Sequence, residues 1–190
     1  MSDTLTDGML AVAILVLATA TYAVWHGAPW IPSRRGERDA LFKAAGMKDG
    51  DELHDLGSGG GAVIFDAARR YPASRVVGVE VFILPYLLSR LRKLISGRKY
   101  ANVRIRYGDF YRHDISSADI VFTFQIPKAY GRLAKKFAEC KNDCTVVVEA
   151  WPFNELEPLR AVKEGRHLTM YAYRGRQFRR EAGSRRREAE

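Results

Sequence analysis

Residues 52–65 read ELHDLGSGGGAVIF, and this stretch decides the fold that the sequence predicts. A short apolar run leads to Asp55, the glycines Gly57, Gly59 and Gly61 follow, and apolar residues at helical spacing come next. A strand, a glycine turn and a helix in this order present backbone to a nucleotide-like ligand in a doubly wound α/β domain. Glycine is needed because a side chain would hold the ligand away and because some turn positions require positive φ.

Two kinds of ligand fit the glycine spacing. Gly57, Gly59 and Ala62 match the dinucleotide fingerprint G-x-G-x-x-G/A. Gly57, Gly59 and Gly61 form a tighter G-x-G-x-G, which resembles the loop that binds S-adenosylmethionine (SAM) in the seven-strand methyltransferases. Asp55 favours SAM, because a carboxylate two residues before the first glycine attracts an ammonium group and repels a pyrophosphate.

Two more acids stand at the ends of predicted strands. Glu80 lies near the end of the apolar run 75–81, nineteen residues after Gly61, where a carboxylate can accept hydrogen bonds from both ribose hydroxyls. Asp109 follows the predicted strand 102–107 and can accept the exocyclic amine of adenine, while Phe110 can pack on the adenine ring. The predicted cofactor-binding residues are Asp55, Gly57, Ser58, Gly59, Gly61, Glu80, Asp109 and Phe110.

Apolar runs and helical periodicities alternate along the rest of the chain. After the strand that begins at residue 52, strands are predicted at 75–81, 102–107, 119–124, 144–150 and 167–173. Helices are predicted at 34–45, with Ser33 as its N-cap, and at 61–70, 85–96 and 128–139. Near-continuous apolar strands are typical of parallel sheets covered on both faces, so we expect a doubly wound, mostly parallel α/β sheet.

The N-terminal region predicts a membrane anchor. Residues 8–25 carry no charge, and as a helix they would span about 27 Å, close to the thickness of the hydrocarbon core. The basic residues follow this segment: Arg34, Arg35 and Arg38. The positive-inside rule then places the N-terminus outside and the remaining chain in the cytoplasm or an equivalent compartment. A buried N-terminal helix of a soluble domain is the alternative.

Composition divides the chain into three parts. Residues 1–27 are expected to be the anchor, 28–173 the folded domain, and 174–190, with seven arginines and three glutamates, a basic, disordered tail. The net charge of +9 predicts an anionic partner, which can be phospholipid headgroups, nucleic acid or an acidic protein. Nucleic acid is not favoured, because the basic residues at 90–99 have few aromatic residues among them and are interpreted as a solvated face. The tail is expected either to solubilise the protein or to contact anionic lipid. Cys140 and Cys144 have no clustered histidine to complete a zinc site, so no metal is expected.

Asp55 with the glycine loop, Glu80 and Asp109, in this order, resemble the class I SAM-dependent methyltransferases over residues 29–173. Three short elements, PWIPS (29–33), FQIP (124–127) and WPF (151–153), look like those of the small protein-lysine methyltransferases related to the ATP synthase c-subunit lysine methyltransferase.

This resemblance implies SAM as cofactor and a protein lysine, on a membrane-associated protein, as methyl acceptor. It also implies an aromatic channel for the acceptor, for which the candidates are Trp30, Phe124, Gln125, Tyr130, Trp151 and Phe153. We interpret His54 and His113 as structural rather than as general bases.

Two other functions stay open at this point. Gly60 and Gln125 differ from residues common in the family, which would fit a membrane-anchored module that binds SAM or a dinucleotide without catalysis. A small-molecule methyltransferase would share every predicted SAM residue, because only the acceptor pocket would differ.

Overall fold

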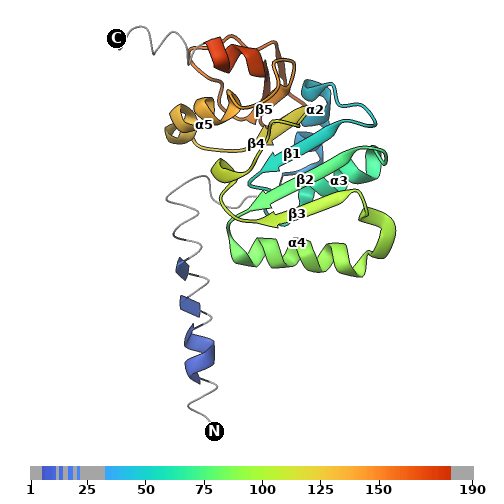
Figure 1. Ribbon diagram of the computed structural model, residues 1–190, viewed down its shortest axis with the longest axis vertical. Coiled ribbons are helices and arrows are strands. Elements are labelled where there is room, and N and C mark those ends of the chain that lie inside the picture. Colours follow the sequence, from blue (N-terminus) through green and yellow to red (C-terminus); the bar gives the residue numbers. More distant parts are fainter. Residues whose placement is uncertain (1–5, 12, 15–16, 19–20, 22–32, 181–190) are drawn as a thin grey trace.

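The computed structural model describes residues 6–11, 13–14, 17–18, 21 and 33–180. Its centre is a seven-stranded sheet with the order β3-β2-β1-β4-β5-β7-β6, as Figure 1 shows. The strands are β1 (Glu52–Leu56), β2 (Arg75–Glu80), β3 (Val103–Tyr107), β4 (Ile120–Thr123), β5 (Thr145–Glu149), β6 (Arg160–Val162) and β7 (Met170–Arg174). Strands β1 to β5 are parallel, whereas β7 is antiparallel to both β5 and β6. The predicted doubly wound, mostly parallel sheet is confirmed.

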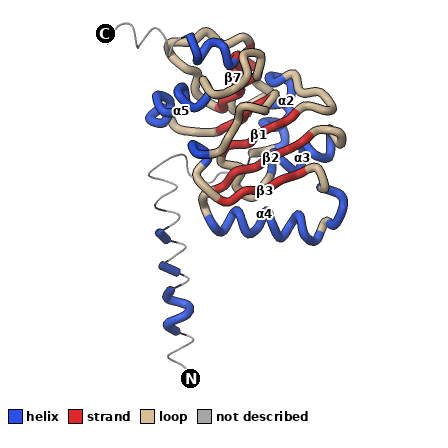
Figure 2. Tube along the Cα trace, viewed as in Figure 1, coloured by secondary structure: helices blue, strands red, loops and turns tan. Residues whose placement is uncertain are grey.

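Helices lie against the sheet, as the tube in Figure 2 shows. They are α2 (Arg35–Ala45), α3 (Ala62–Arg70), α4 (Ile83–Ile95) and α5 (Tyr130–Phe137), with 3₁₀ turns η1 (Gly97–Tyr100), η2 (Phe110–Arg112) and η3 (Pro127–Ala129). Side chains alternate between the two faces of each strand, so the sheet has two separate cores. One core lies under α2 and α3, and the other lies under α5.

The strand order positions the site. From β1 the chain moves outward through β2 to β3 and then returns to β4 on the other side of β1. Such a reversal opens a crevice at the carboxyl ends of the two central strands, where α/β sheets bind ligands. Asp55 near the end of β1 and the glycine loop that follows lie at this crevice.

Several predicted boundaries need correction. The N-cap of α2 is Arg34 rather than Ser33, because the Glu37 side chain accepts a 2.5 Å hydrogen bond from the Arg34 backbone N–H. Strand β6 was not predicted, since its three residues are mostly exposed and lack an apolar pattern. Helix α4 begins at Ile83, before the proline that was expected to open it.

The domain also continues past residue 173, where the sequence predicted a disordered tail. Arg174 belongs to β7, residues 175–180 are helical, and Phe178 is buried against Phe137 and Phe153. The Phe178 ring holds this segment on the core together with hydrogen bonds from Gln177 to the Glu157 carbonyl and from Arg179 to the Cys140 carbonyl. Residues 181–190 lie outside the described residues.

The predicted anchor at residues 8–25 falls only in part on described residues. Those that the structure describes, from residue 6 to residue 21, are helical and exposed. Within the described part of the chain, no helix is both long enough and apolar enough to cross a bilayer.

Candidate active site

The glycine loop connects β1 to α3 in a conformation that needs its glycines. Gly57, Gly59 and Gly61 have φ values of 97°, 52° and 85°, in the left-handed region where side chains are strained. A Cβ on Gly61 would also lie 2.5 Å from the Phe65 ring. The backbone N–H groups of Gly57 and Ser58 both donate to the carbonyl of Val79, so the loop is tied to β2. Gly61 is the N-cap of α3, which directs the positive end of this helix toward the crevice.

Glu80 holds the same loop from the neighbouring strand. One carboxylate oxygen accepts a 2.6 Å hydrogen bond from the Gly59 N–H, and the other accepts a 2.7 Å bond from the Phe82 N–H. Burial raises the pKa of Glu80, while these backbone donors act to lower it. Because each carboxylate oxygen has two lone pairs, both can still accept a bond from a ligand.

Asp55 is buried without a partner. The residue is 3% exposed, and among the described residues its carboxylate makes no hydrogen bond or ion pair. Burial, followed by the charges of Glu80 and Glu149, holds the pKa of Asp55 well above its usual range. A cation bound beside it would stabilise the charged form, so the site is electrostatically prepared for one.

Two polar side chains lie close to the loop. The hydroxyl oxygen of Ser58 is completely buried and has no hydrogen-bond partner in the described part of the chain. Buried polar groups almost always have a hydrogen-bond partner, and a ligand bound at the loop would provide one for this hydroxyl. Gln125, from the end of β4, is buried with its amide nitrogen 3.3 Å from where a Cβ on Gly57 would lie. The structure thus brings Gln125 to the glycine loop rather than to the surface.

Asp109 and Phe110 lie at the start of η2, beyond β3. One Asp109 oxygen accepts a 2.9 Å bond from the Tyr111 N–H, and the other lies 3.7 Å from the Arg132 guanidinium. The same guanidinium lies over the Tyr111 ring, 3.7 Å from its centre. Phe110 is buried in the core on the α5 side of the sheet and its ring contacts the Tyr111 ring, so most of its ring already has protein contacts.

The other side of the crevice is aromatic. Phe124 lies directly after β4 and Trp151 lies after β5. Their rings are nearly parallel, with an interplanar angle of 9° and ring centres 6.0 Å apart. Trp151 is 40% exposed, so this pair forms part of the surface of the site. Tyr130 supports the pair from behind, because its hydroxyl donates a 2.6 Å hydrogen bond to the Trp151 carbonyl and its ring stacks on Phe153. Trp30, the remaining predicted channel residue, lies outside the described residues.

Glu149 is a residue that the sequence reasoning missed. It ends β5, is 3% exposed, and has no hydrogen bond or ion pair from its carboxylate among the described residues. Burial, and then the charge of Glu37 on α2, raise the pKa of Glu149 to about 7. The available signal was the run TVVVE, which ends a buried strand with an acid as ELHD and RVVGVE do.

The backbone after Glu149 is strained. Ala150 has φ 75°, the only positive φ of a non-glycine residue in the described part of the chain, and the Trp151 N–H donates to the Glu149 carbonyl at 3.0 Å. This is a γ-turn of the rare, strained kind, and such strain gathers at functional sites. The turn sets the positions of Glu149 and Trp151 relative to each other.

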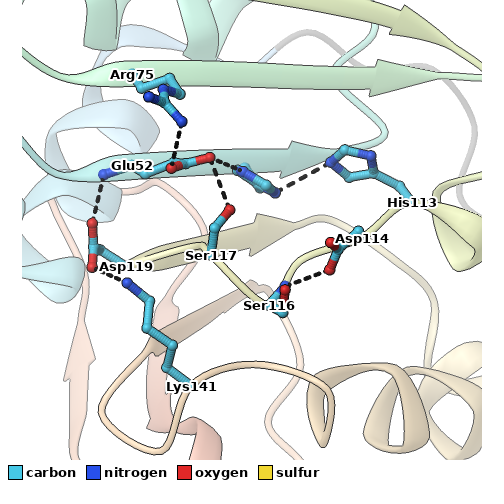
Figure 3. Close-up of polar contacts among 9 residues, drawn as sticks. Glu52, Arg75, His113, Asp114, Ser116, Ser117, Asp119 and Lys141 are labelled. Atoms are coloured by element: carbon cyan, nitrogen blue, oxygen red, sulfur yellow. Dashed lines mark hydrogen bonds and ion pairs between the residues drawn. The ribbon is translucent and has the colours of Figure 1, made fainter.

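The two histidines considered as bases lie elsewhere. His54 precedes Asp55 on β1 and therefore points to the opposite face of the sheet. It lies 2.9 Å from a Glu52 oxygen and 3.2 Å from the His113 ring nitrogen, in the network drawn in Figure 3. Burial lowers the pKa of both rings, to about 4 for His113. They form a buried polar network, as the structural interpretation predicted.

The fold and this site together define a class of protein. A parallel sheet that reverses order beside β1, a tight glycine loop after β1, and a buried acid at the end of each of the first two strands are the features of a class I SAM-dependent methyltransferase. The fit to SAM rests on three observations: the unpartnered Asp55, the orphaned Ser58 hydroxyl and the left-handed glycines.

Comparison with known proteins gives the family. Residues 55–160 match the model of the ANTKMT methyltransferase domain, and the chain belongs to this family of SAM-dependent methyltransferases. A protein-lysine N-methyltransferase of Saccharolobus islandicus (strain REY15A) is 26% identical over 152 residues, which cover 76% of this chain and 92% of the relative.

Solved structures agree on the fold. An RNA methyltransferase from Salinibacter ruber, solved in complex with S-adenosyl-L-homocysteine, has a TM-score of 0.70 and 27% identity over 76% of this chain and 93% of its own. A precorrin-6y C5,15-methyltransferase from Geobacter metallireducens has a TM-score of 0.57 and 16% identity over 77% of this chain and 92% of its own, a likeness of fold alone. SAM is therefore the cofactor, as predicted, and the protein is a methyltransferase.

Proposed function

We propose that the protein transfers a methyl group from SAM to the ε-amine of a lysine in a membrane-associated protein. The observation that carries this proposal is the pair of buried carboxylates at one edge of the sheet, Asp55 and Glu149, which have no partner among the described residues. One of them suits the ammonium group of the cofactor, and the second suits another cation. The name of the Saccharolobus relative supports lysine as that second cation.

The cofactor would be held along the edge formed by β1, β2 and β3. Asp55 would attract the methionyl ammonium, and the Ser58 hydroxyl would gain its missing partner there. Glu80 would accept bonds from the ribose hydroxyls in addition to the backbone bonds that it already accepts. Asp109 would accept the adenine amine. SAM supplies a methyl group on a positively charged sulfur, which is an excellent leaving group.

The acceptor would enter between the aromatic pair and Glu149. Thr123 of β4 is the register partner of Val148 of β5. Phe124 and Glu149 each follow by one residue, so they lie side by side at the ends of these two strands. Aromatic faces attract a lysine ammonium and exclude water from around it. Glu149 then lies where the ammonium would arrive, with a carboxylate that no other described residue neutralises.

The chemistry needs an amine without its extra proton. A base is most effective when its pKa lies near the working pH, and burial has raised the pKa of Glu149 to about 7. In a dry site the neutral acid and neutral amine are favoured over the buried ion pair, so the proton passes from the ammonium to Glu149. The lysine nitrogen would then accept the methyl group that SAM supplies, with the thioether as leaving group, and Glu149 would return its proton to solvent. The residues mainly align the two reactants and exclude water.

A tether to the bilayer would favour substrates on the same membrane. The uncharged residues 8–25 support this part of the proposal, and the basic residues after them support a catalytic domain on the cytoplasmic or equivalent side. Confinement to one surface raises the effective concentration of membrane-bound substrates. Alkaline extraction of cell membranes tests the anchor: the full-length protein should stay in the membrane fraction, and its release into the supernatant would contradict it.

Membranes incubated with full-length protein and radiolabelled SAM test the activity. We expect wild type to label a discrete protein on lysine, which peptide mapping by mass spectrometry would locate. Gly57→Arg should abolish labelling, because the side chain would fill the cofactor loop. A matched control, Glu157→Gln, changes an exposed acid outside the site and should label normally. Labelling confined to RNA, lipid or small molecules would contradict a protein acceptor.

A further inference from the structure

Helix α4 carries its apolar side toward solvent. Its leucines recur at helical spacing, as in a helix that buries one face. Six large apolar side chains of α4 are nevertheless exposed, from 42% for Leu84 to 77% for Leu94. They are Leu84, Leu87, Leu88, Leu91, Leu94 and Ile95, which we call the leucine stripe. Figure 1 shows α4 at the outer edge of the domain, beside the edge strand β3.

The opposite side of α4 attaches the helix to the domain. Pro85 and Ser89 are its buried residues, and Tyr86 packs against the core under α3. The Lys93 ammonium donates to the Val103 carbonyl of β3, and the Arg92 guanidinium lies 4.4 Å from the centre of the Phe65 ring. These contacts fix the rotation of α4 about its axis. The leucine stripe therefore stays at the surface.

The surroundings of the stripe are uniformly basic. Residues 81–108 contain seven basic residues and no acid. Three of these residues, Arg90, Arg98 and Lys99, are exposed on α4 or directly after it and form the basic border of the stripe. Arg92 and Lys93 contact the domain, and the charge of Arg106 acts on the His54–His113 pair. Burial and the charges of Arg90 and Arg104 lower the pKa of Lys93, which reflects how closely these cations are gathered. Exposed leucines bordered by basic side chains are the composition of a helix that lies in the headgroup region of a membrane.

We propose that the leucine stripe and its basic border bind the surface of an anionic lipid bilayer. Each basic residue near such a surface is attracted to it, and each leucine that enters it leaves water. A second copy of the chain is a poorer occupant, because a two-fold contact would bring the basic borders of two stripes together. This surface is separate from residues 8–25 and from the methyl-transfer reaction, so the inference goes beyond the proposed function and does not depend on it.

Docking would also orient the active site. Helix α4 begins directly after the end of β2, and the Phe82 N–H at its start donates to Glu80 in the cofactor site. A bilayer that holds α4 therefore holds this edge of the sheet near the lipid surface.

Site-specific fluorescence in the full-length protein tests the proposal. An NBD fluorophore, whose emission rises and shifts to the blue when it leaves water, is attached to Leu91→Cys, in the stripe. The matched control is Glu157→Cys, an exposed position outside it. Cys140 and Cys144 are buried, and wild type treated with the dye measures any labelling at these two positions.

Each variant is reconstituted in vesicles of phosphatidylcholine, or of phosphatidylcholine mixed with phosphatidylglycerol. In the mixed vesicles we expect emission at residue 91 to rise severalfold and to be quenched by doxyl-labelled lipid, while residue 157 stays in water. Arg90→Glu combined with Arg98→Glu should abolish this response, with unchanged binding of S-adenosylhomocysteine as evidence that the domain is folded.

Three results would overturn the proposal. The first is a label at residue 91 that stays in water although the protein sediments with the mixed vesicles. The second is an equal response in the two kinds of vesicle, which would exclude recognition of anionic lipid. The third is the same blue shift in neutral detergent together with a doubled mass by light scattering, which would make the stripe an interface between two copies.

Discussion

The acids at the carboxyl edge of the sheet differ from the acids elsewhere in the domain. Asp55 and Glu149 are buried and unpaired among the described residues, and burial raises the pKa of both. Asp66, on α3, instead contacts three arginines, which hold its pKa at about 2 despite the opposing effect of burial. Glu52 and Asp119, at the opposite edge, also have basic partners. Paired acids stabilise this fold, whereas unpaired buried acids cost stability and leave room for cationic ligands.

The largest effect should come from removing the base at the carboxyl edge. Glu149→Gln should lower kcat by about 10²- to 10⁴-fold, the usual contribution of a general base. The SAM affinity measured by calorimetry should change little, because Glu149 lies on the acceptor side. Wild-type activity should rise with pH through an apparent pKa of about 7, and the variant should lose this dependence. If the activity of the variant rose with pH in the same way, the titrating group would be the substrate lysine rather than Glu149.

Removing the cofactor acid should separate binding from stability. Asp55→Asn should weaken binding of S-adenosylhomocysteine by about 10- to 100-fold, since hydrogen bonds to a charged group contribute about 1.5–3 kcal/mol. Because a raised pKa means that ionised Asp55 destabilises the folded state, the thermal midpoint of the free protein should not fall. A large fall in that midpoint would show that Asp55 has a structural partner in the folded protein.

The paired acid Asp66 should behave in the opposite way. Asp66→Asn should lower the free energy of unfolding at pH 7 by about 1–3 kcal/mol, because it removes charged hydrogen bonds to Arg38, Arg69 and Arg70. The folded pKa of Asp66 lies below its ordinary value of 3.8, so this stabilisation is present above that pH and is lost as pH falls through about 2. Urea unfolding measures the difference, and unchanged SAM binding is the control. If wild type and Asp66→Asn had equal free energies of unfolding, Asp66 would not stabilise the fold, and it would not differ from Asp55 in this respect.

The smallest effect concerns His113. Burial and the charges of His54, Arg106 and Lys136 lower its pKa to about 4, while Asp114 acts to raise it. His113 is therefore protonated below about pH 6.5 in the unfolded chain but only below about pH 4 in the folded protein. The free energy of unfolding falls as pH drops from about 6.5 to about 4. His113→Asn should reduce this acid loss by about 1 kcal/mol after allowance for solvent screening. Thermal unfolding at pH 5 and pH 8 measures it; parallel losses in both proteins would assign the sensitivity to other groups.

The fold could be predicted because its signals are local. Apolar strands, the glycine turn and the acid at the end of each strand lie within single stretches, so the sheet and the cofactor edge followed from the sequence. The acceptor edge could not be predicted in the same way. Whether Glu149 is paired depends on its neighbours in space, such as Glu37, which is 112 positions away in the chain.

Two further differences have the same cause. The periodicity of α4 predicted a helix with an apolar face but could not say which face the sheet would take, and the sheet takes the other one. The arginines after residue 173 predicted disorder, because composition shows neither the burial of Phe178 nor the hydrogen bonds that residues 175–179 make to the domain.

The start of α2 has a mechanical consequence. The Arg38 guanidinium donates to the Ser33 carbonyl at 2.5 Å and to Asp66 of α3 at 2.9 Å. Any tension on the chain before residue 33 is therefore transmitted through Arg38 into α3, the helix that begins at Gly61. If the N-terminal segment is held in a bilayer, thermal motion of that bilayer acts on the domain through the same helix that shapes the cofactor loop. The Arg38 bonds thus connect residue 33 to the helix that begins at the cofactor loop.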